Sequence, residues 1–505
     1  MSSPGPVGMK GNPQADHYVP FFQQTDGRVV QRDIFPLPSC GPRSMLGGSD
    51  VCRSVQRRLQ KACHIDSMVE DCICALNAMY SNGRVEKAKT GSALSLAQCE
   101  VVRHLRNSMQ MLGPCPQGLT GAEAVSQLRA FDGYGEDQCP ASIAAYSPEL
   151  LSLPSKGNCA VALDRLLGDD GQTIVSEFTR SRLLDKNEAR SRLAECGLRQ
   201  CYTDPALRDP RTFGTFVKRL RDADLVEFTL EPGVERIECF FVGKKDGRIR
   251  MVIDCRRANC WFHHPDKVHL CTAEALSRIQ LDEGQSLYVS TADLKDAFYH
   301  FELPTELRPF FTMRGVAAGE VGVSESGKIA VTPGQKIYPR LKVLPMGWSH
   351  ALWWCQVIHQ RIVSTIGATS LNCLEDKAAA PSSRCCHLEY VDNFVVIGTS
   401  EDEVGRMADS GVNALRSKGL VVHEEEKSSQ QIAVLGWEFD YSIFKPKSKR
   451  VWRVRRAFEY FLNKGMISGR QLEKVVGHAT FLCLGRRESL AVFGETYTFI
   501  HRNYH

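Results

Sequence analysis

Two stretches of the sequence decide the fold: STADLKDAFY at residues 290–299 and LEYVDNFVV at residues 388–396. Each sets one aspartate, Asp293 or Asp392, in a strand-like run of apolar residues. Carboxylates that converge from separate strands can hold a pair of divalent cations for phosphoryl transfer. A single aspartate in such a run is more often a turn residue at a strand end, so the neighbouring segments have to distinguish the two interpretations.

A basic hairpin is predicted upstream of the first aspartate, in FFVGKKDGRIRMVIDCRRAN at residues 240–259. Two alternating apolar runs flank an Asp-Gly pair, a pattern typical of a β-hairpin with a tight turn. Lys244, Lys245 and Arg250 would lie near its tip, where lysine offers a point charge and arginine a planar fork for phosphate. A solvated basic turn is the alternative for this hairpin taken alone.

In this order, the segments resemble the fingers and palm of a reverse transcriptase of retroelement type. The resemblance covers residues 239–505, with its motifs between residues 239 and 440. It implies an RNA-directed DNA polymerase that adds deoxynucleotides to a primer 3′-hydroxyl, with an RNA template, a DNA primer and dNTP as partners. It also implies two Mg²⁺ ions, or Mn²⁺, held chiefly by Asp293 and Asp392.

The resemblance extends to the nucleotide site. Arg250, with Lys244 or Lys245, would neutralise the phosphates of the incoming nucleotide. Phe298 would pack beneath the sugar and exclude a ribose 2′-hydroxyl, because a hydroxyl cannot occupy the volume of a phenyl ring. A core aromatic is the alternative for Phe298, and an RNA-templated RNA polymerase is disfavoured by its ring.

The segment LPMGWSHA at residues 344–351 resembles the loop that lines the nascent base pair in this family. Gly347 would let the backbone approach the nucleotide closely, and Ser349 is expected to be the N-cap of the helix that follows. Many retroviral relatives have Gln where this chain has Met346. Any hydrogen bond from that Gln to substrate would be absent here.

A second departure lies at Asn393, where the family normally has a second aspartate after Asp392. Asparagine keeps one acceptor oxygen but loses the charge that hard cations such as Mg²⁺ favour. Asn393 is therefore included among the predicted catalytic residues, and a competing hypothesis remains open. The chain could be a weakened or inactive reverse-transcriptase-like scaffold that binds nucleic acid.

Two later segments complete the resemblance. Lys427 resembles the lysine that protonates the leaving pyrophosphate, although taken alone it would be assigned as a surface lysine. Leu435, Gly436 and Trp437, within VLGWEF at residues 434–439, resemble the hairpin that holds the primer end.

A basic stretch follows, KPKSKRVWRVRR at residues 445–456, with seven basic side chains and a Trp. Such a stretch can follow a phosphate backbone, and a solvated linker or a localisation signal is the alternative. The predicted nucleic-acid contacts are Lys449, Arg450, Trp452, Arg453 and Arg455. After it, Ser468 and Gln471 predict a capping box at the start of a helix that suits a polymerase thumb, in which His478 is expected to be packed or solvated.

The predicted fold class is α+β, a right-hand polymerase of fingers, palm and thumb with a mainly helical N-terminal extension. Residues 51–200 are expected to be helical over 51–79, 93–111 and 173–196, as an extension of the fingers, an RNA-binding module or a protein-interaction domain. The predicted divisions are a tail without fixed structure over 1–50, this helical region over 51–200, fingers and palm over 201–445, and a basic connector with a helical thumb over 446–505.

The amino-acid composition is compatible with a nucleic-acid polymerase but would not by itself indicate one. The 505 residues are 43% hydrophobic with a net charge of +5, which permits nucleic-acid binding. The 20 cysteines are scattered without paired Cys-x-x-Cys units, which argues against a zinc ribbon and favours reduced thiols. No N-terminal secretion signal and no run of about 18 apolar residues is present, so an intracellular protein without membrane association is expected, nuclear or cytoplasmic.

Two further expectations concern what lies between and beyond the motifs. Asp392 follows Asp293 by 99 residues, longer than in compact members of the family, and residues 315–334 and 368–386 are expected to be inserted surface loops. No ribonuclease H or integrase segment is recognised. Such activities, if needed, are expected from another chain.

Overall fold

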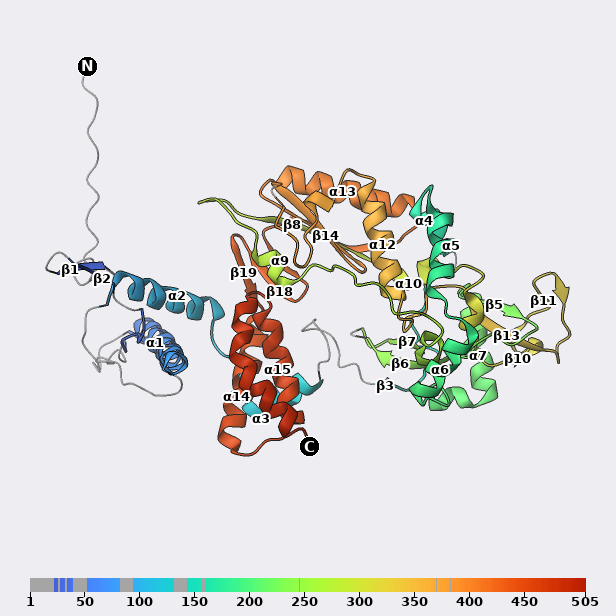
Figure 1. Cartoon of the computed structure of the whole chain (residues 1–505), viewed down its shortest axis with the longest axis horizontal. Helices are drawn as coiled ribbons and strands as arrows, with labels where there is room; N and C mark the ends of the chain where they lie inside the picture. The colour runs from blue at the N-terminus through green and yellow to red at the C-terminus, as the bar shows by residue number, and fades with distance from the viewer. Residues whose placement is uncertain are drawn as a thin grey trace, which may run out of the picture. The chain divides into compact units, whose positions relative to one another are not determined.

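A computed structural model of the chain combines helices with several small antiparallel sheets, in agreement with the predicted α+β class (Figure 1). Contacts divide the chain into two compact units, Met1–Gln117 and Gly118–His505, whereas the sequence predicts a boundary near residue 200. No helix in the described residues is both long and apolar enough to cross a bilayer. The structure describes residues 22–25, 28–31, 34–39, 52–81, 94–130, 143–155, 160–244, 246–368, 370–381 and 383–505.

The first unit contains two helices close to the predicted positions. These elements are β1 (Phe22–Thr25), β2 (Arg28–Gln31), α1 (Arg53–Tyr80) and α2 (Leu96–Leu112). Leu37 is fully buried, and the side-chain amide of Asn77 on α1 accepts from its N–H at 2.6 Å and donates to its carbonyl at 2.7 Å. Within the segment predicted to lack fixed structure, the described residues therefore form a hairpin and an irregular segment that is hydrogen-bonded to α1.

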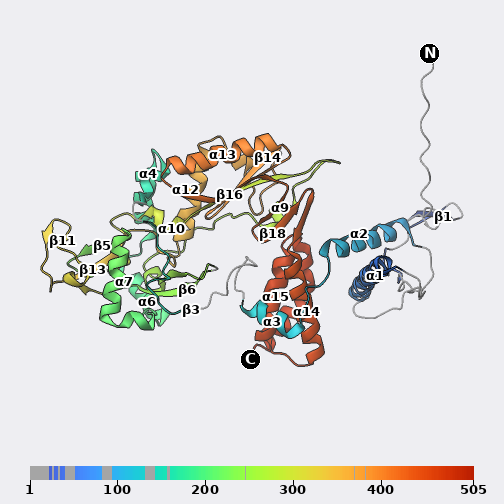
Figure 2. The same ribbon diagram turned by 180° about the vertical axis from the view of Figure 1, so that it is seen from behind.

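The central sheet of the second unit has the strand order β14-β15-β8-β16, and all pairs are antiparallel. Its strands are β8 (Tyr288–Leu294), β14 (Cys385–Tyr390), β15 (Asn393–Gly398) and β16 (Val422–Ser429). Helices α12 (Ala351–Ser364) and α13 (Glu401–Ser417) cover one face (Figures 1 and 2). Ala292 and Phe394 point toward these helices, whereas Val289 and Val395 pack in a separate core on the other face.

This alternation follows from the two-residue period of a strand. It puts Asp293, one residue from Ala292, on the face that the helices do not cover. This same face, which the helices leave uncovered, packs against β17 (Gln431–Val434) and β18 (Trp437–Asp440). These strands continue into β19 (Ile443–Pro446).

The predicted basic hairpin is confirmed as β6 (Glu238–Gly243) paired with β7 (Ile249–Asp254). The core beneath it also receives side chains from α4 (Leu163–Leu167), α5 (Gly171–Arg182), α6 (Lys186–Cys196) and α7 (Pro210–Asp222). Helix α5 packs on α12, where the ring centres of Phe178 and Trp354 are 4.7 Å apart. The three alternatives that the sequence left open for residues 51–200 therefore stay open.

The single helix expected over 173–196 is two helices. Asp185 accepts hydrogen bonds from the N–H groups of Asn187 and Glu188 and so caps a new helix, α6. Such a capping carboxylate satisfies N–H groups that a first helical turn leaves unpaired.

The two expected surface loops are exposed over much of their length but also contain buried residues and short elements, so that expectation is confirmed only in part. In residues 315–334, Ala318 and Val321 of α11 (Ala318–Val321) are fully buried, and β10 (Val316–Ala317) pairs with β13 (Lys336–Leu341). In residues 368–386, Cys373 and Leu374 are buried at the edge of the central sheet, where Leu374 N–H donates to the His387 carbonyl at 2.8 Å. The apolar residues scattered through both segments make these contacts possible.

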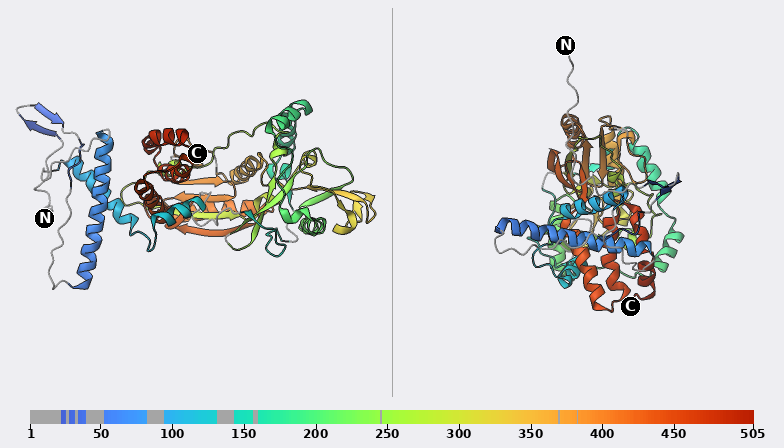
Figure 3. Two further views of the ribbon diagram at one scale, coloured as in Figure 1. Left: turned by 90° about the horizontal axis from the view of Figure 1, so that it is seen from below. Right: turned by 90° about the vertical axis from the view of Figure 1, so that its left-hand side faces the viewer.

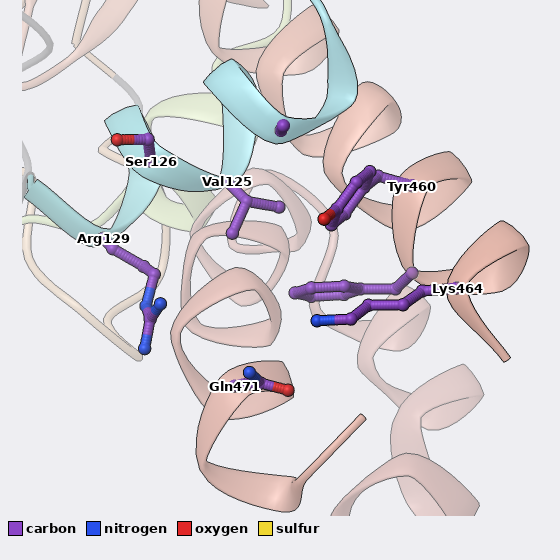
Figure 4. Close-up of a pocket in the computed structure, with 8 residues that line it drawn as sticks. Val125, Ser126, Arg129, Tyr460, Lys464 and Gln471 are labelled. Carbon is purple, nitrogen blue, oxygen red and sulfur yellow. The ribbon is translucent and has the colours of Figure 1, made fainter. Parts of the chain in front are cut away.

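The C-terminal helices form a bundle with α3 (Gly121–Ala130), which the sequence did not predict to join them (Figure 3). The bundle contains α14 (Ser448–Lys464), α15 (Gly469–Cys483) and α16 (Gly494–Arg502), and the predicted capping box of Ser468 and Gln471 is confirmed. His478 is not at a catalytic position, since its Nε2 donates to the Leu128 carbonyl at 2.9 Å. A pocket of about 490 Å³ opens between α3 and this bundle, lined by Val125, Arg129, Tyr460 and Lys464 among others (Figure 4).

We expect Leu128→Ala to destabilise the C-terminal bundle by about 2–5 kcal/mol, because truncating a buried leucine loses transfer free energy and leaves a cavity. Leu128 is 1% exposed, among the apolar side chains of α14 and α15. Denaturation followed by circular dichroism would measure the change. The control is Leu462→Ala on α14, since Leu462 is 82% exposed. Equal losses in both variants would contradict the docking of α3.

Candidate active site

Strand pairing brings the two predicted metal-binding aspartates together. Asp293 lies near the end of β8, and Asp392 lies in the turn between β14 and β15. In the register of β15 with β8, Asn393 is directly opposite Asp293, and the Leu294 N–H donates to the Asp392 carbonyl at 2.8 Å. The sequence-predicted hairpin with its turn at 391–392 is therefore confirmed.

The two carboxylates interact electrostatically. Partial burial, reinforced by the negative charge of Asp392, raises the pKa of Asp293 to about 7. Burial also raises the pKa of Asp392. Two adjacent carboxylates repel each other when both are ionised, and a divalent cation bound between them would stabilise the ionised forms. The residues present therefore fit the Mg²⁺ that the resemblance implies.

The turn that carries Asp392 has a strained backbone. Val391 has a φ of +58°, a left-handed conformation that is rare for a β-branched residue. Two side chains of α12 bind the backbone of Val391. Gln356 Oε1 accepts from the Val391 N–H at 2.8 Å, and His359 Nδ1 donates to the Val391 carbonyl at 3.0 Å. Both helical side chains are fully buried.

Sequence reasoning missed Gln356 and His359. The available signal was weak: Gln356 and His359 are three apart and so share one side of the helix, but Gln360 and Arg361 follow directly and are also polar. What they bind could not be known without the tertiary structure.

His423 on β16 is a third residue that sequence reasoning missed. It is opposite Asp293 in the strand register, and its Nε2 lies 2.8 Å from Asp293 Oδ1. The positive form of His423 opposes the rise in the pKa of Asp293. No motif indicated this contact, because it depends on a pairing that is interrupted by register shifts further along the strand.

Arg250 interacts with the aspartate pair, whereas the predicted position of Phe298 beneath a sugar stays a prediction. Arg250 is exposed on β7, and its guanidinium opposes the rise in the pKa of Asp392 that burial causes. Phe298, on α10 (Ala297–His300), is half-buried against the core, whereas the next residue, Tyr299, is fully enclosed. Of these two rings, Phe298 is the one with exposed surface.

Lys244 is directed toward a different segment. Its Nζ donates to Ser152 Oγ at 3.1 Å, and its N–H donates to the Arg248 carbonyl across the turn at 2.7 Å. The other predicted lysine, Lys245, lies outside the described residues. The structure therefore brings Arg250 to the carboxylates and gives Lys244 a partner elsewhere.

The loop at Met346 and Gly347 is bonded to β7. Gly347 has a φ of +130°, and a Cβ there would overlap the Ile253 carbonyl. The Ile253 N–H donates to the Met346 carbonyl at 3.0 Å, and the Asn259 side chain donates to the Gly347 carbonyl at 3.2 Å. The glycine is thus required by a backbone approach within the chain itself.

The predicted N-cap at Ser349 is wrong. Helix α12 has His350 as its N-cap, without a side-chain hydrogen bond to the helix. Ser349 instead donates its N–H to Asn259 Oδ1 at 3.0 Å. The loop is held by Asn259, so the usual serine cap has no role.

Lys427 is not brought to the aspartate pair. Its ammonium forms an ion pair with Asp409 on α13, on the helix-covered side of the sheet. Asp293 faces the opposite side. Lys427 and Asp293 therefore point to opposite faces of the sheet. A sequence motif does not reveal this, because the pairing of β16 with β8 contains register shifts.

The predicted primer-end hairpin forms between β17 and β18. Leu435 and Gly436 make its turn, with φ values of +49° and +83°. Trp437 is buried, stacked on Phe444 at 4.8 Å and tilted against Phe481 of α15 at 5.7 Å. Trp437 therefore joins this hairpin to the C-terminal helices and presents little surface to a ligand.

The basic stretch folds mainly as α14, an amphipathic helix, which corrects two predicted contacts. Arg450 is 3% exposed with its guanidinium 4.0 Å from the Phe481 ring centre, and Trp452 is 2% exposed. Both belong to the helical core. Arg455 pairs with Glu459 at 2.9 Å. The other two predicted contacts are on the outer side, where Lys449 is exposed and Arg453 is half-buried.

We expect Gln356→Ala to lower the free energy of unfolding by about 1–3 kcal/mol, because the Val391 N–H loses a buried acceptor in a strained turn. The matched control is Gln360→Ala, one helical turn later, whose amide bonds the Glu375 carboxylate at 3.3 Å. Thermal denaturation of both variants would measure the difference. A loss in Gln356→Ala no larger than in the control would show that α12 does not hold the turn.

One comparison with known proteins covers the site just described. Residues 242–439 match the model of the family described as reverse transcriptase (RNA-dependent DNA polymerase). The matched segment contains the aspartate pair, Arg250, Phe298 and the loop at Gly347. No curated protein matches the sequence. The chain is thus a reverse-transcriptase-like protein over residues 242–439.

Proposed function

We propose that the chain is an RNA-directed DNA polymerase that adds deoxynucleotides to a primer 3′-hydroxyl by two-metal phosphoryl transfer. The observation that carries this proposal is the β8–β15 register, which sets Asp293 beside the turn of Asp392. In this proposal the central sheet is the palm, the β6–β7 region forms the fingers, and the bundle of α14 to α16 with α3 is the thumb.

Asp293 and Asp392 would hold the metal ions. When bound, two such cations stabilise the attacking and leaving oxygens and neutralise charge on the triphosphate. The chain's own contribution is positioning. The turn that carries Asp392 is held by α12, and the strand pairing sets its distance from β8.

The other residues of the site divide the recognition of the nucleotide. Arg250 is exposed and interacts electrostatically with Asp392, so it can bind the phosphates beside the metals. The half-buried ring of Phe298 would lie beneath the sugar. Lys427 would have to leave Asp409 before it could protonate the leaving pyrophosphate, so we assign it no step.

The second candidate function, an inactive nucleic-acid-binding scaffold, is favoured by one specific contact. Asn393 Nδ2 donates to Asp392 Oδ1 at 3.0 Å. The amide thus occupies an oxygen of a proposed metal ligand at the position where a second carboxylate would add negative charge. This contact weakens metal binding relative to an Asp-Asp pair.

Primer extension on an RNA template with dNTP, in Mg²⁺ and separately in Mn²⁺, distinguishes the two functions. We expect extension by the natural chain and a loss of roughly a hundredfold or more in Asp293→Asn, because that substitution removes a charged metal ligand. Asn393→Asp restores the second carboxylate and should increase activity in Mg²⁺. Extension found only in Asn393→Asp would instead support the scaffold.

Phe298→Ala tests the choice of sugar. We expect the preference for dNTP over rNTP to fall by roughly tenfold or more, since removing the ring opens the volume that a 2′-hydroxyl needs. Competition between the two nucleotides during extension measures the ratio. Phe228→Ala is the control, because Phe228 is also half-buried but lies on β5 (Val226–Thr229). Unchanged discrimination in Phe298→Ala would remove Phe298 from sugar selection.

A further inference from the structure

A buried cluster of three metal-ligating side chains lies at β14, the strand that leads into the turn of Asp392, and at the segment beside it. Cys373, His387 and Glu389 are 6%, 3% and 2% exposed. One ligand atom from each lies within 4.8 Å of the other two. His387 Nδ1 is 2.8 Å from Glu389 Oε1, and Cys373 Sγ is 3.7 Å from Glu389 Oε2.

The fold assembles this cluster from two segments. His387 and Glu389 are two residues apart on β14, so their side chains lie on one face. Their partners in the sheet, Val396 and Phe394, belong to the core beneath α12 and α13, which identifies that face. Cys373 follows the short helix η4 (Ser370–Asn372), and its backbone bridges to His387 along the open edge of β14.

An unpaired imidazole nitrogen lies in the same core. His359 on α12 is fully buried and donates from Nδ1 to the Val391 carbonyl, and its Nε2 has no hydrogen-bond partner among the described residues. Burial lowers the pKa of His359, which keeps Nε2 as a bare lone pair, and His359 interacts electrostatically with Glu389 and His387. Buried polar atoms without a partner are rare and require an explanation.

The donor types select among metals. Thiolate, imidazole and carboxylate together are typical ligands of Zn²⁺, whereas Mg²⁺ and Ca²⁺ favour oxygen alone. One thiolate and one carboxylate would balance the two charges of Zn²⁺, so the loaded cluster would carry no net charge in a dry interior. Without metal, an ion pair between His387 and Glu389 is the simpler arrangement.

We propose that Cys373, His387 and Glu389 bind one zinc ion, with a water molecule in the fourth position or His359 Nε2 after a side-chain movement, since His359 is outside the three-residue cluster. The ion would fasten the segment after η4 to the strand that leads into Asp392. The site is distinct from the aspartate pair, and the inference does not depend on polymerase activity.

Binding requires a proton balance. The Cys373 thiol releases its proton to solvent as the sulfur–zinc bond forms. A His387 imidazolium paired with Glu389 also releases one proton to solvent, so that the ring binds through a neutral nitrogen while Glu389 binds as a carboxylate. Burial raises the pKa of the Cys373 thiol, so the metal has to provide the driving force for its deprotonation.

The test is metal analysis of the full chain, purified without chelator, followed by replacement with Co²⁺ as a spectroscopic probe. We expect one zinc per chain. We also expect a thiolate-to-cobalt charge-transfer band, with the intense visible bands of a four-coordinate site. Cys373→Ser should abolish the charge-transfer band. Cys386→Ser should keep it, because Cys386 lies on the same strand but packs in the core on the other face.

A second measurement guards against a Cys373→Ser variant that fails to fold. The natural chain is treated with a chelator in the absence of other divalent ions, and its melting temperature is recorded before and after Zn²⁺ is restored. We expect a lower melting temperature without zinc that recovers on addition. A natural chain that contains no zinc, gives no cobalt–thiolate band and shows no shift with Zn²⁺ would overturn the proposal in favour of a simple His–Glu ion pair. A charge-transfer band retained in folded Cys373→Ser would overturn it too.

Discussion

The antiparallel pairing of β8 with β15 is the constraint on which the rest of the site depends. The register of this pairing sets Asp293 beside the turn of Asp392. A shift of the register by one residue would turn the Asp293 side chain toward α12 and α13. Apolar side chains on both faces of these strands oppose such a shift, because each face has its own core. Two carboxylates are thus held close together by burial of their neighbours, at the cost of their mutual repulsion.

The strained turn extends this constraint to the β6–β7 hairpin. A left-handed valine costs roughly 1–3 kcal/mol, and the contacts of Gln356 and His359 with the Val391 peptide offset it. The same helix begins directly after the loop of Met346, which is hydrogen-bonded to β7. Since β7 also carries Arg250, a continuous series of backbone and side-chain contacts joins the proposed phosphate ligand to the turn of Asp392.

Local features were predictable from the sequence, and contacts between distant segments were not. The β6–β7 hairpin, the β14–β15 hairpin and the Ser468 capping box depend on residues close in the sequence, and all three are confirmed. The burial of Arg450 and Trp452 depends instead on which side of α14 meets α15, and the placement of Lys427 depends on strand alternation through a bulge. The docking of α3 and the contact of His423 with Asp293 have no local signature. Tertiary packing determines each of them.

The hydrogen bonds around the aspartate pair bear on whether the site can function. Asn393 occupies Asp392 Oδ1, and His423 occupies Asp293 Oδ1. A carboxylate has two oxygens and about four acceptor positions, so each aspartate keeps a second oxygen for a metal ion. The two contacts also orient the carboxylates before any ligand arrives, as hydrogen-bonded partners do for metal ligands in general. Asn393 therefore reduces the negative charge of the site but still orients the Asp392 carboxylate. This arrangement favours a weakened metal site over a blocked one.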